Sequence, residues 1–286
     1  MSTYIYQPRD RVSFAEGVQF LQQQGRTVIP QPVNITAGSV VDRIRELGRA
    51  SGMDFQDFEI ELSAFRSYCA AAGYSDRYAE YYPDNQHEKA LEHFIALSLL
   101  KLQREDVFID IASEHSPVAE IYGRLTGADT YSQDIMYAAG IDGQRIGGDA
   151  CAMPIPDGFA SAASLTCSLE HFEEDADVGL FVELARILRP GGSVCVVPFY
   201  VNVEHVVQTD PAVGVPANVI FDAGAPVYCA EGWGNRHGRF YSPRTFVDRI
   251  VKRVDSCVRF SFFHVRNAPD VHSSVYVRFA FLATRL

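Results

Sequence analysis

Acidic side chains follow three short apolar runs in the middle of the chain. Asp110 lies in VFIDIA, residues 107–112, Asp129 is expected to end the next short strand, and Asp149 follows QRIGG. Ligands of an open parallel sheet bind beyond the carboxyl ends of its strands, so acids at these ends are placed to meet one. An acid after the second strand accepts both hydroxyls of a ribose, and one after the third accepts from an adenine amino group. The pattern predicts a nucleoside site.

A serine and a Glu-His pair follow the next apolar run, FASAASLTC. Glu170 and His171 come directly after this predicted strand, together with Ser168, at the mouth of the expected site. A base here would take a proton from an acceptor hydroxyl or amine, which makes His171 a candidate catalytic residue. The alternative is structural: His171 packs against, or caps, the helix that starts at Glu173.

A second group of polar and aromatic residues lies further along, in WGNRHGRFY. Trp233, Arg236, Arg239 and Tyr241 are candidates for binding a substrate with hydroxyls or a carboxylate, and His237 is a second candidate base. The alternative is that Arg239 and Tyr241 only anchor the loop to the sheet. No His or carboxylate cluster has the spacing of metal ligands, so no metal is expected.

The elements that would position these residues alternate between strand-like and helical patterns from residue 107 onward. Such alternation predicts a doubly wound, mostly parallel α/β sheet covered on both faces. The segment EEDADVGLFVELARILRPGG predicts a helix with acids in its first turn and a Pro-Gly-Gly stop. Another helix is expected from Ser242-Pro243, and CVRFSFFHV and SSVYVRFAFLATR predict a closing antiparallel pair.

Two further regions frame this core. Residues 1–103 are expected to form a helical extension that serves as a lid or a homodimer surface, and residues 104–286 the main domain. Within the extension, MDFQDFEIELSAFRSYC predicts one amphipathic helix capped by Asp54. Residues 201–241 show no clean period and are expected to form a substrate-side insertion or lid.

The composition of the chain argues against some classes of binding partner. The 286 residues carry a net charge of −11 without a basic run, which argues against nucleic acid and anionic membrane surfaces. The start, MSTYIYQPRD, has no basic segment followed by an apolar one, and no stretch reaches the roughly 18 apolar residues of a membrane helix. A cytoplasmic protein is therefore expected, with its six cysteines reduced.

The sequence resembles a known family over about residues 106–200. GGDACAMPIPDGFASAASLTCSLEHF, the following Glu-rich helix with ELARILRPGG, and the strand SVCVVPF look like class I S-adenosylmethionine-dependent methyltransferases of the small-molecule, type 11-like kind. The closing helix and hairpin agree in order. The resemblance implies a seven-stranded Rossmann-like sheet, S-adenosylmethionine as cofactor, and methyl transfer to a small polar metabolite, with a sugar-like acceptor as our expectation.

The resemblance also implies roles for single residues. Asp149 and Ala150 match the acid that binds adenine and its neighbour, and Asp129 matches the acid that binds ribose. Ser168 matches the position beside the cofactor's sulfonium, and Asp110 matches the acid that opens the first motif.

The first motif departs from the family pattern. Its three glycine positions are Ala112, Glu114 and Ser116 here, and Ala112 is still expected to contact the cofactor. Glu114 adds bulk and negative charge near the cofactor's carboxylate. Either the loop turns Glu114 outward, or the pocket binds S-adenosylmethionine poorly. The second case allows a methyltransferase-like protein that binds a ligand or partner without methyl transfer, or an enzyme of this fold that uses another nucleotide cofactor.

Overall fold

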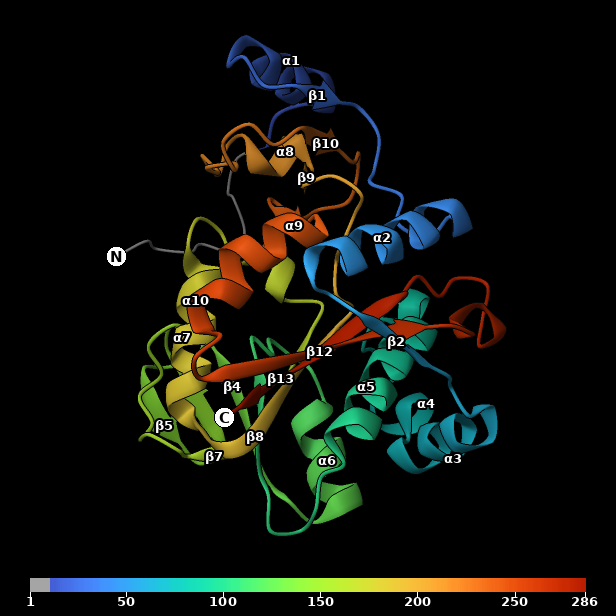
Figure 1. The fold of residues 1–286 in the computed structure, drawn as a ribbon, viewed down its shortest axis with the longest axis vertical. Coiled ribbons are helices and arrows are strands. Elements are labelled where there is room, and N and C mark those ends of the chain that lie inside the picture. Colours follow the sequence, from blue (N-terminus) through green and yellow to red (C-terminus); the bar gives the residue numbers. More distant parts are fainter. Residues whose placement is uncertain (1–10) are drawn as a thin grey trace.

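A nine-stranded mixed sheet forms the centre of the protein, which a computed structural model describes for residues 11–286 (Figure 1). The strand order is β2-β12-β13-β8-β7-β3-β4-β6-β5. The bounds are β2 (Phe55–Phe58), β3 (Val107–Ile111), β4 (Asp129–Asp134), β5 (Gly140–Asp142), β6 (Arg145–Gly147), β7 (Ala160–Thr166), β8 (Leu188–Val197), β12 (Val258–Val265) and β13 (Phe279–Arg285).

The central strands run parallel, as predicted. β6, β4, β3, β7 and β8 pair in parallel, while β13 is antiparallel to both β8 and β12. Six of the seven predicted strands lie where the sequence places them, including the closing antiparallel pair, whereas the strand expected to end at Asp129 is found at Asp129–Asp134. Two short strands extend the edges: β2 runs parallel to β12, and β5 runs antiparallel to β6. The predicted fold class is confirmed.

Helices cover both faces of the sheet. One face carries α2 (Gly38–Ser51), α7 (Ala176–Ile187), α9 (Pro243–Phe246) and α10 (Lys252–Val254), with a π-helical stretch, Val247–Val251, between the last two. The other carries α3 (Leu62–Ala72), α5 (Gln86–Leu100) and α6 (Val118–Thr126), with α4 (Tyr74–Arg77) following α3. Successive residues of β8 belong to opposite cores, Val194 and Val196 to one and Cys195 and Val197 to the other. Both faces of β8 are therefore buried.

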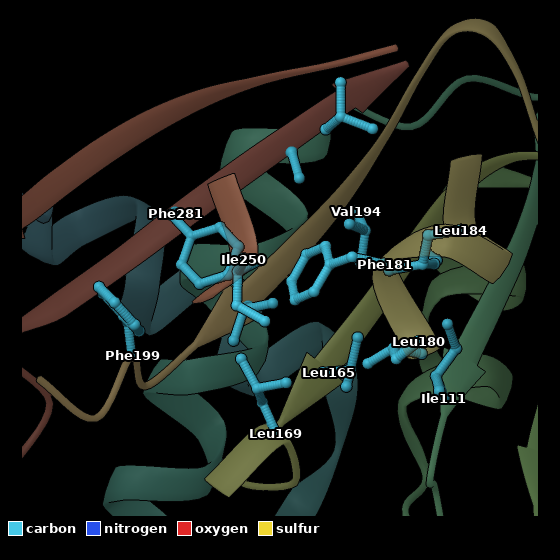
Figure 2. Close-up of a cluster of buried hydrophobic side chains, with 14 of the residues drawn as sticks. Ile111, Leu165, Leu169, Leu180, Phe181, Leu184, Val194, Phe199, Ile250 and Phe281 are labelled. Atoms are coloured by element: carbon cyan, nitrogen blue, oxygen red, sulfur yellow. The ribbon is translucent and has the colours of Figure 1, made fainter. Parts of the chain in front are cut away.

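Helix α7 forms as its sequence predicts. Leu180, Phe181 and Leu184 repeat at helical spacing and are at most 1% exposed. They pack with Val194, Phe281 and Ile250 in the core that Figure 2 shows. After the helix, Gly191 adopts a φ of 80° within the Pro-Gly-Gly segment, where β8 begins.

The predicted helix over residues 53–69 is wrong in its first half. Phe55–Phe58 is the edge strand β2, and the helix α3 begins only at Leu62, capped by the side chain of Glu61. Phe55 is 5% exposed, and its ring lies 4.8 Å from that of Phe279. Backbone pairing with β12 and burial among aromatic rings decide the strand, and neither is visible in the local spacing of apolar residues.

The insertion has regular structure of its own. It contributes β9 (Val206–Thr209), α8 (Pro211–Gly214), β10 (Val227–Cys229) and β11 (Gly238–Phe240). With β1 (Val28–Ile29) from the N-terminal segment these strands form a second sheet of order β1-β10-β9-β11, which α1 (Phe14–Gln23) accompanies at the top of Figure 1. The N-terminal segment thus supplies strands to both sheets, and the domain boundary at 103/104 stays a prediction. No helix within residues 11–286 is long and apolar enough to span a membrane.

Candidate functional site

A cavity of about 480 Å³ lies at the carboxyl ends of the parallel strands. Residues after β3, β4, β6, β7 and β8 line it, together with residues of the N-terminal segment and the insertion. The predicted site residues in its wall are Ala112, Asp149, Ala150, Ser168, His171, Trp233, Arg236 and His237. The sheet therefore brings together side chains separated by more than a hundred positions, as the position of ligands in open α/β folds predicts.

The loop after β3 contains no glycine, yet two of its residues adopt the left-handed backbone conformation that favours glycine. Ala112 has a φ of 53° and Glu114 a φ of 49°, a left-handed conformation that costs a residue with a side chain roughly 1 to 2 kcal/mol. Neighbouring groups hold it: the Ala112 amide donates to Gln133 Oε1 at 3.2 Å, and the Glu114 amide donates to Asp134 Oδ2 at 2.7 Å. The Glu114 side chain is 43% exposed and lies 3.2 Å from His115 Nδ1.

Asp129 does not reach the cavity. The expectation that a strand ends at this residue is wrong, because β4 begins there and ends at Asp134. Asp129 is exposed at the amino end of β4, where the Tyr131 hydroxyl donates to it at 3.1 Å. The acid that leaves β4 at the cavity is Asp134, which is 6% exposed. Sequence reasoning missed it, although its place after TYSQ could have indicated the strand end.

The other two predicted acids differ in position. Asp149 lines the cavity, and its Oδ1 accepts from the Cys151 amide at 2.9 Å. Asp110 is fully buried in β3 beneath the loop, where Ser164 Oγ donates to its Oδ1 at 3.3 Å. Burial raises the pKa of Asp110 to about 7. Asp110 is not among the residues that line the cavity, and its Oδ2 has no hydrogen-bond partner among the described residues.

A polar group follows β7 in the short helix of Leu169–His171. Glu170 is 4% exposed, and its Oε1 lies 3.5 Å from His171 Nε2. The His171 Nδ1 lies 2.5 Å from the backbone oxygen of His237, and the ring centroid of Trp233 lies 5.9 Å from that of His171. The insertion thus closes over the residues that follow β7. A Cβ on Gly238 would lie 2.5 Å from the Trp233 ring, so glycine is needed there to seat the indole.

His237 is buried in the same wall. It is 1% exposed, and burial, with the nearby Arg239 charge, lowers its pKa to about 3. Both ring nitrogens lack a hydrogen-bond partner among the described residues, as do Ser168 Oγ and Glu170 Oε2. With so low a pKa, His237 is suited to hydrogen bonding as a neutral imidazole rather than to taking up a proton.

Helix α5 contributes a second buried polar group that sequence reasoning missed. Lys89 Nζ lies 3.1 Å from Glu92 Oε2, at 7% and 0% side-chain exposure. The Cys167 thiol donates to Glu92 Oε1 at 3.1 Å and contacts the hydroxyls of Tyr200 and Tyr276. Burial raises the pKa of the Cys167 thiol, so it is protonated at neutral pH. Helix α5 packs against β7 and β8, which takes these charged side chains out of solvent.

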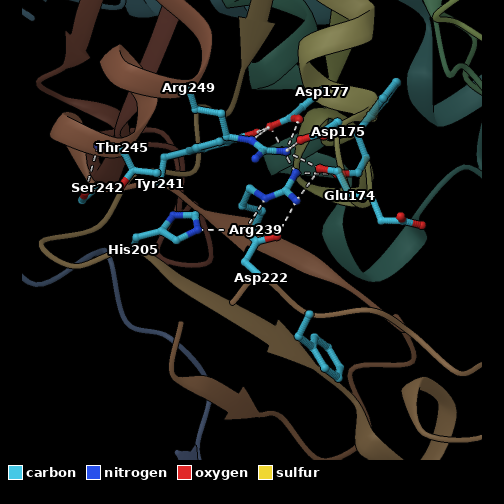
Figure 3. Close-up of polar contacts among 12 residues, drawn as sticks. Glu174, Asp175, Asp177, His205, Asp222, Arg239, Tyr241, Ser242, Thr245 and Arg249 are labelled. Atoms are coloured by element: carbon cyan, nitrogen blue, oxygen red, sulfur yellow. Dashed lines mark hydrogen bonds and ion pairs between the residues drawn. The ribbon is translucent and has the colours of Figure 1, made fainter. Parts of the chain in front are cut away.

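Arg239 and Tyr241 do not line the cavity, which corrects their prediction as substrate-binding residues. Arg239 is fully buried and forms ion pairs with Asp222 at 2.7 Å and Asp177 at 3.1 Å (Figure 3). The Tyr241 hydroxyl donates to Asp177 at 2.6 Å. The network links the insertion to α7, whereas the alternative drawn from the sequence was that these residues anchor the loop to the sheet. Arg236 does line the cavity, where it donates to both carboxylate oxygens of Glu173.

The sheet has the predicted Rossmann-like methyltransferase arrangement, and the cavity lies at the carboxyl ends of its parallel strands. Residues 111–196 match the model of the family described as a methyltransferase domain. This match gives the chain a methyltransferase domain, whose cofactor is S-adenosylmethionine. A search of curated proteins by sequence finds no match.

Several solved structures are similar in fold at low identity. The 1,6-didemethyltoxoflavin-N1-methyltransferase of Burkholderia thailandensis, with 1,6-didemethyltoxoflavin and S-adenosylhomocysteine bound, is 11% identical, covering 79% of this chain and 90% of that one, with a TM-score of 0.44. A putative methyltransferase in complex with the Haloferax volcanii Trm112 activator is 12% identical, covering 81% and 99%, with a TM-score of 0.43. The geranyl diphosphate C-methyltransferase of Streptomyces coelicolor A3(2) is 9% identical, covering 69% and 79%, with a TM-score of 0.41.

Proposed function

We propose that the enzyme methylates a hydroxyl, or a similar hydrogen-bonding group, of a small uncharged metabolite such as a sugar. The supporting observation is the state of the two cations in the described cavity wall. Lys89 is paired with Glu92, and Arg236 is paired with Glu173. A carboxylate or phosphate acceptor would have to compete with these acids. Ser168, Glu170 and His237 offer polar atoms without partners, which suit an acceptor that both donates and accepts hydrogen bonds.

The same proposal assigns the cofactor site. Asp149 and Ala150 would hold the adenine, and Asp134, in place of Asp129, the ribose hydroxyls. The loop at Ala112 and Glu114 would lie along the amino-acid end. When bound, S-adenosylmethionine supplies an electrophilic methyl group on a sulfonium.

The chain would contribute mainly alignment and the exclusion of water. The cavity is closed on one side by Tyr82 and Lys89 from the N-terminal segment and on another by Trp233 and Arg236 from the insertion. A wall built from both segments can hold an acceptor oxygen in line with the methyl group, and such positioning supplies a large part of the rate of a two-substrate reaction.

Calorimetric titration with S-adenosylmethionine and S-adenosylhomocysteine tests the cofactor site. We expect Asp149→Ala and Asp134→Ala each to weaken binding by roughly 1 to 3 kcal/mol, since each would remove a hydrogen bond that the bound nucleoside covers from water. Asp129→Ala is the matched control, because it removes an exposed acid of the same strand at the opposite end. Unchanged affinity in both folded cavity variants would refute the assignment.

Three related sugars test the acceptor class. Glucose is uncharged, gluconate is anionic and glucosamine is cationic, while all three carry similar hydroxyls. We expect formation of S-adenosylhomocysteine with the uncharged member and its loss with gluconate. Gluconate turned over faster than glucose would contradict the proposal, because the paired Lys89 and Arg236 leave no charge for a carboxylate.

A further inference from the structure

Glu170 and His171 are adjacent residues with opposite surroundings. Glu170 lines the cavity at 4% exposure, and its Oε2 has no partner among the described residues. The His171 side chain also lines the cavity but is 36% exposed. Between them, Glu170 Oε1 and His171 Nε2 are 3.5 Å apart. The pair therefore joins a buried carboxyl group to a ring that reaches solvent.

The proton on the His171 ring can be assigned from its other nitrogen. His171 Nδ1 lies 2.5 Å from the backbone oxygen of His237. A carbonyl oxygen only accepts, so Nδ1 must carry a hydrogen and donate it. In the neutral ring Nε2 then holds a lone pair and faces Glu170 Oε1. Two lone pairs in this position favour uptake of a proton between them, either on the carboxyl group or on the ring.

The surrounding groups do not supply that proton. The titratable and charged groups that face the pair are Lys89 and Glu92 on α5, Cys167 after β7, Glu173, Tyr200 after β8, and Arg236 and His237 in the insertion. Lys89 with Glu92 and Arg236 with Glu173 are ion pairs without net charge. Burial raises the pKa values of Cys167 and Tyr200 and lowers that of His237 to about 3, so all three are neutral near pH 7.

We propose that Glu170 and His171 form a proton relay that carries the acceptor's proton from the cavity to solvent. The inference rests on the proposed function, because methylation of a hydroxyl must release one proton. The acceptor oxygen forms a bond to the methyl carbon, the bond from that carbon to sulfur breaks, and its electron pair stays on sulfur. The hydroxyl proton passes to Glu170, then, after the carboxyl group turns, to His171 Nε2, and from there to water.

In this relay Glu170 is the catalytic base, and His171 accepts the proton from Glu170 and passes it to water. Glu170 has a raised pKa because it is buried, although the His171 charge opposes the rise. A carboxylate with a raised pKa is a stronger base, which suits proton removal near neutral pH. His237 keeps the His171 tautomer fixed through its backbone oxygen and takes no part in the transfer.

Trp233 gives a measurement that needs neither acceptor nor methyl transfer. It is the only tryptophan of the 286 residues, and its ring lies 5.9 Å from that of His171. An imidazolium quenches indole emission more strongly than a neutral imidazole. We expect the emission of the full chain, saturated with S-adenosylhomocysteine, to fall as the pH is lowered through the titration of His171.

Variants then test the coupling. In Glu170→Gln the midpoint of the fluorescence titration should move to lower pH, since the amide no longer stabilises the imidazolium. His171→Gln should abolish the transition. His115→Gln is the matched control, because His115 also lies beside a glutamate, 3.2 Å from Glu114, but 58% exposed. Circular dichroism confirms that each variant is folded.

An unmoved midpoint in folded Glu170→Gln would overturn the relay. With glucose as acceptor, Glu170→Gln should lower kcat by 100-fold or more, a size typical of lost general-base catalysis. His171→Gln should lower kcat without raising KM, and added imidazole should restore part of it; a wild-type rate in either variant also overturns the relay. If glucose is not methylated although the midpoint moves, the proposed acceptor class fails while the coupled pair stands.

Discussion

At the scale of single residues, the buried charges of the insertion are structural. Among residues 11–286, Arg239 is the largest fully buried side chain, and it links Asp222 in the insertion to Asp177 on α7 (Figure 3). It also donates to the backbone oxygens of Phe172 and Glu174. The segment that follows the catalytic candidates Glu170 and His171 is thereby held in place. Arg239 therefore supports the cavity wall and does not itself line the cavity.

This network predicts a pH dependence of stability. Burial alone would raise the pKa of Asp222, but hydrogen bonds from Arg239 and His205 lower it well below its usual range. A depressed folded-state pKa contributes stability that is present above the unfolded value of about 4 and lost as the pH falls from there. We expect Asp222→Asn to cost about 3 kcal/mol at pH 7, because the buried Arg239 loses a partner.

Urea unfolding at several pH values checks this. The difference in free energy of unfolding between wild type and Asp222→Asn should shrink as the pH falls from about 5 to 3. Asp157→Asn serves as control, since Asp157 is 79% exposed in its ion pair with Arg186 and should matter by less than about 1 kcal/mol. A difference that is constant with pH would refute the ion-pair origin of the effect.

At the scale of elements, the sequence predicts best where the local pattern and the tertiary environment agree. The acids, apolar stripe and Pro-Gly-Gly stop of α7 all indicate the same helix, which the structure confirms. In residues 55–69 the aromatic spacing fits a helix, but pairing with β12 makes Phe55–Phe58 a strand. For Asp129 the error was one of direction: the residue starts β4 instead of ending it, which moved the predicted ribose acid to the wrong edge of the sheet.

The prediction of cavity residues likewise succeeds where the signal is local and fails where it depends on tertiary packing. Asp149 and His171 were found because they follow apolar runs, a local signal. Lys89 and Glu92 were not, because they lie on α5, and only its packing against β7 and β8 takes these charges out of solvent. No spacing within α5 distinguishes such a pair from an ordinary surface pair.

Gly48 in α2 packs against Phe55 of β2, the strand that was not predicted from the sequence. A Cβ on Gly48 would lie 2.6 Å from the Phe55 ring and 2.8 Å from the Met53 backbone oxygen. Helix propensity alone predicts that Gly48→Ala stabilises by about 1 kcal/mol. We expect the opposite sign, a loss of roughly 1 to 3 kcal/mol, because the helix meets both a buried ring and backbone there.

Thermal or urea unfolding shows directly whether Gly48→Ala raises or lowers the free energy of unfolding. Gly38→Ala, in the first turn of the same helix, is the matched control, since its Cβ would meet nothing within 4 Å. That variant should be neutral or slightly stabilised. Stabilisation by Gly48→Ala would mean that Phe55 does not pack against α2, and the account of β2 as a buried edge strand would fail.

At the scale of the whole molecule, the N-terminal segment is a structural partner of the sheet. Leu91 and Ile95 of α5 are fully buried in the core that also holds Cys195 and Val197 of β8. In the same segment β2 extends the main sheet and β1 pairs with β10 of the insertion. If the segment were a lid, its removal would leave the core of the remaining chain complete. Removal of this segment would instead expose one face of the sheet.

Expression of residues 104–286 alone therefore tests whether residues 1–103 are a structural part of the core or a dispensable lid. We expect this fragment to lack cooperative unfolding and to bind a hydrophobic dye, because one face of β7 and β8 loses its covering helix and the insertion loses a strand. Adding residues 1–103 as a separate chain should restore cooperative unfolding and the affinity for S-adenosylhomocysteine. A fragment that unfolds cooperatively by itself would instead establish 1–103 as a dispensable extension. Loss of cofactor affinity in such a folded fragment would then trace to Tyr82 and Lys89, the residues through which this segment lines the cavity.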